Sequence, residues 1–180
     1  MTIKRVFDIY FSSMVILFLF PIYVAISLIV FFNLGTPIFY NAIRVGKNNK
    51  NFKIYKFRTM QANSNVPKNK IMNFLRKTNL DELPQFLNVF LGDMSVVGPR
   101  PHDLDEDILF EEKIKNYKLR KEVLPGITGL SAIMGNRGGS SIEFITQRVR
   151  FDLEYIDKQS LYFDIIIILK TIKTIFKPNH

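Results

Sequence analysis

The stretch IYFSSMVILFLFPIYVAISLIVFF, residues 9–32, decides how the chain is organised. Its 24 residues carry no charge. One helix of that length measures about 36 Å, enough to cross the roughly 30 Å apolar core of a bilayer. Pro21 lies in the middle of the stretch. Because proline lacks a backbone N–H, it kinks or breaks a helix interior. The stretch therefore predicts two helical arms that meet near Pro21.

Basic residues flank this stretch on both sides. Lys4 and Arg5 precede it, and Arg44, Lys47 and Lys50 follow it. Basic flanks favour the cytoplasmic side of a membrane. If both flanks stay there, the segment enters and returns as a hairpin. Each arm of about 12 residues, about 18 Å, then reaches only part of the way across. A re-entrant helix–break–helix and a kinked transmembrane helix both fit these features.

Polar residues beside and within the stretch carry two smaller predictions. Asp8 follows Lys4 and Arg5 at helical spacings of four and three, which predicts a surface salt bridge. Serine hydroxyls inside the stretch are expected to bond to carbonyls that the break frees. These serines are Ser12, Ser13 and Ser27.

The charge of the chain indicates the kind of partner it meets. It has 25 Lys and Arg against 16 Asp and Glu, a net charge of +9. This surplus favours nucleic acid, anionic lipid or a phosphorylated substrate. The chain has no cysteine, which excludes disulfides and thiolate metal sites. Its two histidines, His102 and His180, are too few for a histidine-rich metal cluster.

Beyond residue 34 the pattern predicts a second domain, 35–180, of α+β class and mainly helical. Apolar and polar residues alternate around GKNNKN, residues 46–51, which predicts a hairpin. Helices are expected at 70–77, 80–91, 103–122, 142–157 and 161–176, with a strand within LPGITGL. On the last helix Lys170, Lys173 and Lys177 share one face. Both an interfacial membrane helix and a core-packing helix fit that face.

The stretch RKTNLDELPQFLNVF, residues 76–90, holds the residues most relevant to chemistry. Asn79 and Glu82 have the spacing of a capping box at a helix start. Pro84 and the acidic pair Asp81–Glu82 also suit a first helical turn. Taken alone, the stretch therefore favours a structural role for the pair.

Basic residues in several loops support a chemical role as well. They are Lys56 and Arg58 in YKFRTM, Arg76, Arg100 in GPRP, and Arg137 in GNRGG. The two prolines beside Arg100 fix its backbone for bidentate contact with phosphate. A carboxylate pair beside phosphates either holds Mg²⁺ or attacks phosphorus.

The chain resembles the small monotopic phosphoglycosyl transferases, the bacterial sugar transferase family. The resemblance rests on KRVFDIY with an apolar segment broken at a proline, FKIYKFRTM, LRKTNLDELPQFLNVFLGDMSVVGPRP, PGITGLSAI, RFDLEY and SLYFDIIIILKTI. These stretches cover nearly the whole chain, and the long central one is highly specific. Two positions depart from the pattern. Phe20 stands where relatives often have serine, and Asn136 separates Gly135 from Arg137 in a loop that usually carries a Gly-Arg pair.

The resemblance implies transfer of a sugar 1-phosphate from a UDP-sugar to a polyprenyl phosphate, usually undecaprenyl phosphate, with release of UMP. It implies Asp81 as a nucleophile that forms a covalent phosphosugar–enzyme, with Glu82 assisting and Mg²⁺ at both carboxylates. Lys56, Arg58, Arg76, Arg100 and Arg137 are then expected at the substrate phosphates. The resemblance also favours the re-entrant reading of residues 1–34, broken at Pro21. It places the protein on the cytoplasmic face of the bacterial inner membrane.

Two competing hypotheses remain at this point. A membrane-tethered basic scaffold or binding protein would use the acidic pair only as a helix cap. Nucleic acid is disfavoured as a partner because an apolar 24-residue stretch does not belong in such a protein. A one-step enzyme would bind Mg²⁺ with both carboxylates and form no covalent intermediate. The sugar, the glycan pathway and the oligomeric state, including a homo-oligomer, stay open.

Overall fold

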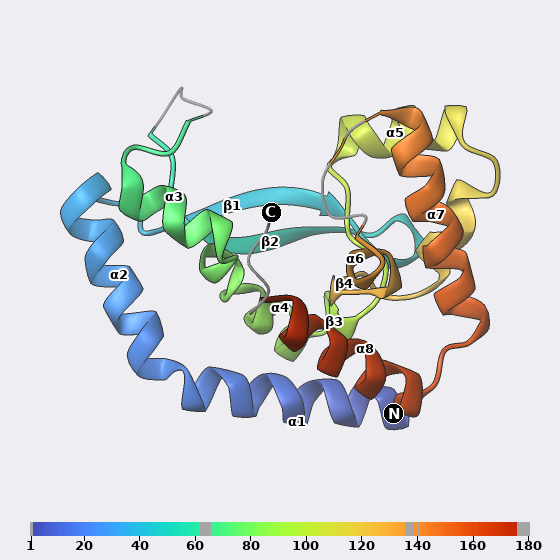
Figure 1. Ribbon diagram of the computed structural model, residues 1–180, viewed down its shortest axis with the longest axis horizontal. Coiled ribbons are helices and arrows are strands. Elements are labelled where there is room, and N and C mark those ends of the chain that lie inside the picture. The colour runs from blue at the N-terminus through green and yellow to red at the C-terminus, as the bar shows by residue number, and fades with distance from the viewer. Residues whose placement is uncertain (1, 62–65, 136–138, 140, 176–180) are drawn as a thin grey trace.

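The computed structural model describes residues 2–61, 66–135, 139 and 141–175. It is mainly helical with two small two-stranded sheets, which confirms the predicted α+β class (Figure 1). The α-helices are α1 (Ile3–Phe18), α2 (Phe20–Leu34), α3 (Lys70–Lys77), α4 (Gln85–Leu91), α5 (Leu104–Lys113), α6 (Leu130–Ile133), α7 (Ile142–Asp157) and α8 (Leu161–Ile175). The strands are β1 (Phe39–Val45), β2 (Asn51–Phe57), β3 (Ser95–Val97) and β4 (Gly126–Thr128). Three 3₁₀ helices complete the order: η1 (Lys47–Asn49), η2 (Leu80–Glu82) and η3 (Tyr117–Glu122).

The apolar stretch forms α1 and α2, which meet at Leu19 with a bend of 62°. Pro21 lies in the first turn of α2, where its missing N–H removes no helical hydrogen bond. The predicted break is therefore confirmed. Within the described residues, no unbroken helix is long and apolar enough to cross a bilayer, and only the bent pair taken together meets that criterion of length and composition.

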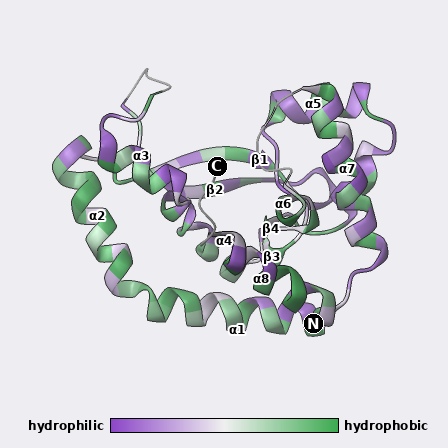
Figure 2. Cartoon of the chain, viewed as in Figure 1, coloured by the Kyte–Doolittle hydropathy of each residue, from purple (hydrophilic) through white to green (hydrophobic). Residues whose placement is uncertain are grey.

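The corner between α1 and α2 is open. The helices have 16 and 15 residues and bend by 62°, a geometry that both a broken span and a re-entrant segment share. Each arm packs on the rest of the chain (Figure 1). Ile26 and Val30 of α2, for example, share a core with Phe57 and Met72. Both arms are apolar along most of their length (Figure 2).

Polar residues of α1 fix it to the domain. Asp8 is buried, and its Oδ1 accepts hydrogen bonds from the Ser95 hydroxyl and the Val96 N–H, both at 3.0 Å. The predicted surface salt bridge of Asp8 is therefore wrong. Lys4 instead pairs with the buried Asp164 of α8 at 2.6 Å. The prediction failed because local spacing does not reveal a partner more than 80 residues away.

Arg5 and the serines complete this picture. The Arg5 guanidinium donates to the Val89 and Phe90 carbonyls at the end of α4, at 2.6 and 2.8 Å. A cation there satisfies carbonyls that the helix leaves free. The serines bond to carbonyls one turn back in their own helices, away from the break, so their predicted role at the break is wrong. These serines are Ser12, Ser13 and Ser27.

Replacing Asp8 by alanine is expected to destabilise the fold. The change leaves the Ser95 hydroxyl and the Val96 N–H buried without their acceptor, which costs about 2 kcal/mol. Thermal melting of the protein in detergent should show a midpoint about 4–8 °C lower. Asp157→Ala, at an exposed position, is the control and should leave the midpoint nearly unchanged. An equally small change for Asp8→Ala would contradict the buried contact.

The predicted hairpin around GKNNKN is confirmed, with β1 and β2 antiparallel from Phe39–Phe57 to Val45–Asn51. The other sheet is a short parallel pair, β3 with β4. The helices predicted at 70–77 and 142–157 are confirmed with the same bounds. The helices predicted at 80–91 and 103–122 are each divided in two. Pro84 cannot donate within a continuous helix, and Asn116 adopts a left-handed backbone.

The last helix, α8, has two apolar sides. Ile167 and Ile168 are buried in the main core, which confirms the core-packing reading. Tyr162 and Leu169, by contrast, are 75% and 56% exposed. Lys170 and Lys173 are exposed as well, and Lys177 lies outside the described residues. The domain thus uses α8 for packing and still presents apolar side chains to its surroundings.

Candidate active site

The acidic pair lies in η2, the single 3₁₀ turn between α3 and α4. Asn79 precedes it with φ 55°, in the left-handed region that asparagine tolerates. In this conformation its side chain makes no capping bond, so the predicted capping box is wrong. The left-handed backbone at Asn79 separates this turn from α3. The turn places Glu82 against Lys56 of β2 and Arg100 of the loop after β3.

Glu82 is held by two cations from distant parts of the chain. Its Oε1 accepts from Lys56 Nζ at 2.6 Å and from Arg100 Nη2 at 3.3 Å. Burial disfavours the charged form of Glu82, but Arg100 and Lys56 outweigh burial and lower its pKa to about 2. Glu82 is therefore ionised at any physiological pH and tied to two of the predicted phosphate-binding residues.

Asp81 has the opposite character. Its residue is only 7% exposed, and within the described chain it forms no ion pair. Burial and the neighbouring Glu82 raise its pKa to about 6, against smaller effects of Lys56 and Arg76. An adjacent carboxylate pair with separated pKa values is typical of sites with distinct chemical roles.

Lys56 reaches the pair because β2 is fixed to α4. The buried Asn88 side chain accepts from the Tyr55 N–H at 3.0 Å and donates to the Lys53 carbonyl at 2.7 Å. Asn88 thus occupies the free edge of β2, one residue from Lys56. Tyr23 of α2 donates to the Leu83 carbonyl at 2.7 Å and holds the segment just after Glu82.

Arg100 is positioned by the close approach of two loops. A Cβ at Gly126 would lie 2.0 Å from the Gly98 nitrogen, so only glycine allows this contact. The Gly126 N–H donates to the Pro99 carbonyl at 2.9 Å. The Arg100 carbonyl accepts from Arg120 Nη2 at 2.7 Å. The GPRP segment is therefore fixed by main-chain contacts on one side and by a buried guanidinium on the other.

The predicted site residues fall into three groups. Lys56, Arg76 and Arg100 surround the acidic pair through the contacts and charge effects described above. Arg58 is not brought to the pair, because its guanidinium donates to the Leu34 and Gly35 carbonyls at the end of α2. Arg137 lies outside the described residues. Pro21 lies beside the bend between α1 and α2.

A buried polar network behind Arg100 was missed by the sequence reasoning. Arg120 pairs with Asp152 of α7 at 2.7 Å, and His102 contacts the Tyr117 hydroxyl at 2.6 Å. One signal was available: Arg148 and Asp152 share a helical face with the apolar Ile145 and Val149. Charged residues on a core-facing stripe indicate buried pairing.

The carboxylate pair fits a magnesium ion only together with a substrate. No cluster of three or more His, Cys, Asp or Glu side chains suited to a metal occurs among the described residues. Mg²⁺ is commonly bound by one or two carboxylates plus substrate phosphates. The unpaired, buried Asp81 carboxylate, next to Glu82, matches that donor set.

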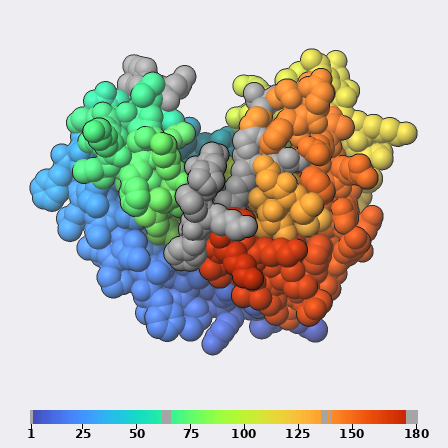
Figure 3. All heavy atoms as spheres, viewed as in Figure 1, coloured from blue at the N-terminus to red at the C-terminus, as the bar shows by residue number. Residues whose placement is uncertain are grey.

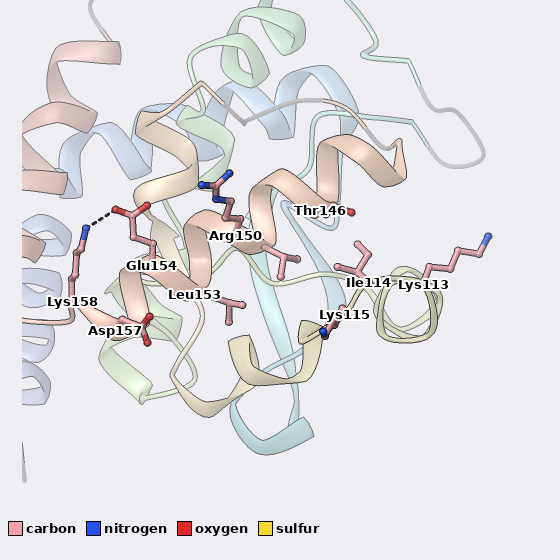
Figure 4. Close-up of a pocket in the computed structure, with 10 residues that line it drawn as sticks. Lys113, Ile114, Lys115, Thr146, Arg150, Leu153, Glu154, Asp157 and Lys158 are labelled. Carbon is pink, nitrogen blue, oxygen red and sulfur yellow. Dashed lines mark hydrogen bonds and ion pairs between the residues drawn. The ribbon is translucent and has the colours of Figure 1, made fainter.

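A cavity of about 500 Å³ lies elsewhere, between α7 and the end of α5 (Figure 4). Its lining includes Lys113, Arg150, Glu154 and Lys158, and none of the predicted site residues. A smaller cavity of about 260 Å³ includes Lys56 and Arg100 in its walls. The space-filling view shows the surface hollowed between the α3 side and the α5–α7 side (Figure 3).

Comparison with known proteins gives consistent matches. The family model described as bacterial sugar transferase matches residues 1–178. The UDP-glucose:undecaprenyl-phosphate glucose-1-phosphate transferase of Escherichia coli K12 is 41% identical over 94% of this chain and 39% of its own length. The exopolysaccharide production protein PSS of Rhizobium leguminosarum bv. phaseoli is 37% identical over 96% of this chain and 94% of its own length.

A third relative differs in the sugar that its name gives. The UDP-N-acetylgalactosamine-undecaprenyl-phosphate N-acetylgalactosaminephosphotransferase of Aeromonas hydrophila is 34% identical over 96% of this chain and 43% of its own length. The chain thus spans about two fifths of the Escherichia coli and Aeromonas relatives and nearly all of the Rhizobium protein.

Proposed function

Because the chain belongs to the bacterial sugar transferase family, we propose that it transfers a sugar 1-phosphate from a UDP-sugar to undecaprenyl or another polyprenyl phosphate and releases UMP. The observation that carries this proposal is the acidic pair itself. One carboxylate is ionised and held by Lys56 and Arg100, and its neighbour is buried without an ion pair among the described residues. Relatives named as UDP-sugar:undecaprenyl-phosphate transferases support the same substrates.

The chemistry proceeds in two displacements. An Asp81 carboxylate oxygen attacks the phosphorus that bears the sugar. The bond to the bridging pyrophosphate oxygen breaks, and UMP leaves with that electron pair. A phosphate oxygen of the polyprenyl phosphate then attacks the same phosphorus and releases the Asp81 carboxylate. Lys56 and Arg100 hold Glu82 beside this centre and add positive charge near the transferring group.

Mg²⁺ would be held by Asp81 and Glu82 together with donor phosphate oxygens. When bound, it supplies positive charge that offsets the charge on the transferring phosphoryl group. The chain's own contribution is to keep both carboxylates fixed in one short turn. Tyr23 on one side and Asn88 on the other hold that turn and the strand beside it.

An exchange measurement tests the proposal. The purified protein is incubated with a UDP-sugar, Mg²⁺ and labelled UMP, without a lipid acceptor. Label that enters the UDP-sugar supports the covalent route, because only a phosphosugar–enzyme returns its sugar phosphate to UMP. If UMP release depends on the lipid and no exchange occurs, the result would support the one-step route without a covalent intermediate. No activity with any UDP-sugar would favour a scaffold.

The donor reaction should depend on pH through Asp81. Only the ionised carboxylate is a nucleophile, and its pKa is raised to about 6 by burial and Glu82. The value of kcat/KM for the UDP-sugar should therefore rise with pH and level off above about pH 6, since it reports the free enzyme. Glu82 is ionised throughout and adds no second step. A flat profile between pH 5 and pH 8 would contradict this assignment.

The same proposal includes a monotopic position on the cytoplasmic face of the bacterial inner membrane. Exposed apolar side chains around the bend support a re-entrant insertion; they include Leu17, Phe18 and Phe20. Tyr162 and Leu169 on α8 support contact of that helix with the interface. Tags at Met1 and His180 should both be protected from outside in intact cells. Exposure of one tag only would instead indicate that the segment spans the membrane as a kinked helix.

A further inference from the structure

The cavity of about 260 Å³ beside the acidic pair carries an excess of positive charge. Four cations line it, Arg44, Lys56, Arg100 and Arg148, against two acids, Asp103 and Glu106. Three of the cations have a carboxylate partner. Arg44 lies 3.7 Å from Asp103, while Lys56 and Arg100 both contact Glu82.

Arg148 is the exception among these cations. Its residue is 5% exposed, and within the described chain it forms no ion pair. Its Nε is buried without a hydrogen-bond partner among the described residues. A buried guanidinium without an acid is costly unless an anion completes its hydrogen bonds. Burial, Arg100 and Arg120 lower the pKa of Arg148, and the nearby acids Asp152 and Glu106 offset only part of this effect.

His102 gives Arg148 a neutral neighbour rather than an acidic one. Burial, with the charges of Arg120 and Arg148, lowers the pKa of His102 to about 2, so its ring stays neutral. The Tyr117 hydroxyl donates to Asp107 at 2.9 Å, which leaves its oxygen to accept from His102 Nδ1 at 2.6 Å. The other ring nitrogen, Nε2, then accepts from Arg148 Nη1 at 3.3 Å. His102 therefore orients Arg148 and adds no negative charge beside it.

We propose that this cavity is a binding subsite for a phosphate monoester and that Arg148 is its principal ligand. The inference rests on the proposed function and adds a residue to it. Lys56 and Arg100 belong both to the cavity wall and to the contacts of Glu82, so an anion bound there lies beside the acidic pair. A guanidinium suits the oxygens of a phosphate.

The size of the cavity limits what enters it. Pockets for drug-sized ligands measure about 300–1,000 Å³, so a cavity of about 260 Å³ holds a phosphate with part of its substituent and not a whole UDP-sugar. Two phosphate monoesters take part in the proposed reaction. One is the leaving UMP, and the other is the polyprenyl phosphate. The test therefore has one arm for each.

The test compares Arg148→Gln and Arg148→Lys with Arg150→Gln in the full chain in detergent. Arg150 lies two residues along the same helix, is exposed and lines the separate cavity of Figure 4. Inhibition of transfer by UMP and the UMP-induced rise in melting temperature report the nucleotide arm. The KM for a short-chain polyprenyl phosphate reports the lipid arm. Uridine, which lacks the phosphate, is the ligand control.

Arg148→Gln is expected to weaken binding of either UMP or the polyprenyl phosphate by about ten- to a hundredfold, the loss typical of a charge-assisted contact. Arg148→Lys should lose less, and Arg150→Gln should stay within about twofold, as should uridine binding. Loss in the UMP arm assigns the subsite to the nucleotide, and loss in the lipid arm assigns it to the acceptor. If Arg148→Gln fails to melt cooperatively, Arg148→Lys is compared in its place.

Two results overturn the inference. One is a folded Arg148 variant that keeps both arms within about twofold of the wild type. The other is a wild-type protein whose melting temperature responds to neither UMP nor inorganic phosphate. Failure of the proposed function looks different, because the wild type would then transfer no sugar phosphate. Loss of a phosphate-induced melting shift in Arg148→Gln would still establish the anion subsite in that case.

Discussion

Replacing Asp81 by asparagine should lower turnover by at least about 10³-fold, because the amide cannot attack phosphorus. The exchange of labelled UMP into the UDP-sugar should be lost in parallel, since the covalent intermediate no longer forms. Steady-state transfer and exchange measured on the same preparation check both effects. Asp105→Asn, at an exposed position of α5, is the control and should retain both activities. Substantial turnover by Asp81→Asn would remove Asp81 as the nucleophile.

The same variant should be more stable than the wild type at pH 7.5 without Mg²⁺. Folding raises the pKa of Asp81 to about 6. Above that pH the carboxylate is ionised in the folded protein, which lowers the free energy of unfolding relative to a neutral side chain. Asparagine removes this cost, which after allowance for partial solvent screening is about 1 kcal/mol, or about 2–4 °C in melting temperature. At pH 4 the gain should vanish, because the wild-type carboxyl is then protonated in the folded state. A lower melting temperature at pH 7.5 would mean that the asparagine disturbs the turn.

Replacing Arg120 by alanine should produce the largest loss of stability. Arg120 and Asp152 are 5% and 1% exposed and pair at 2.7 Å. Removing one partner leaves the other charge buried and unpaired, which costs about 3–5 kcal/mol. The melting temperature should fall by at least about 6 °C. Activity should fall as well, because the Arg100 carbonyl loses the donor that fixes its loop.

A double-mutant cycle separates the interaction energy between Arg120 and Asp152 from the other effects of each substitution. Arg120→Ala, Asp152→Ala and the double variant should show a coupling of at least about 1 kcal/mol, because the double variant leaves no unpaired charge. The exposed pair Lys158 and Glu154, also at 2.7 Å, provides the matched control (Figure 4). Its coupling should stay near 0.5 kcal/mol or below, about the range of exposed helical pairs. Additive losses at Arg120 and Asp152 would show that the ion pair contributes no coupling.

Local patterns in the sequence predicted the elements that depend on local physics. The break near Pro21 follows from its missing N–H, and the hairpin follows from alternation around GKNNKN. The helix α7 starts after Ser141, whose side chain accepts from the Phe144 N–H, and its predicted bounds are confirmed. The acidic pair with Lys56 and Arg100 was also predicted from sequence, and the structure brings these residues together.

Contacts between distant residues were beyond such patterns. Asp8 looked like a surface partner of Lys4 and Arg5, but its acceptor role depends on Ser95 and Val96. Asn79 had the spacing of a cap, yet its left-handed backbone turns its side chain away from that role. Arg58 resembled a phosphate ligand, while the structure engages it at the end of α2. In each case the side chain's partner is set by packing, which residue spacing does not encode.

The packing of α1 and α2 bears on attempts to obtain a water-soluble enzyme by deleting the first 34 residues. Such a deletion would remove the Arg5 contacts to α4 and the Tyr23 contact to the Leu83 carbonyl. It would also uncover Phe57 and Met72, which are buried together with Ile26 and Val30. The first two helices thus help to position the acidic turn. A variant without them would lose these contacts together with its apolar surface, so the proposed activity is best tested on the full chain in detergent.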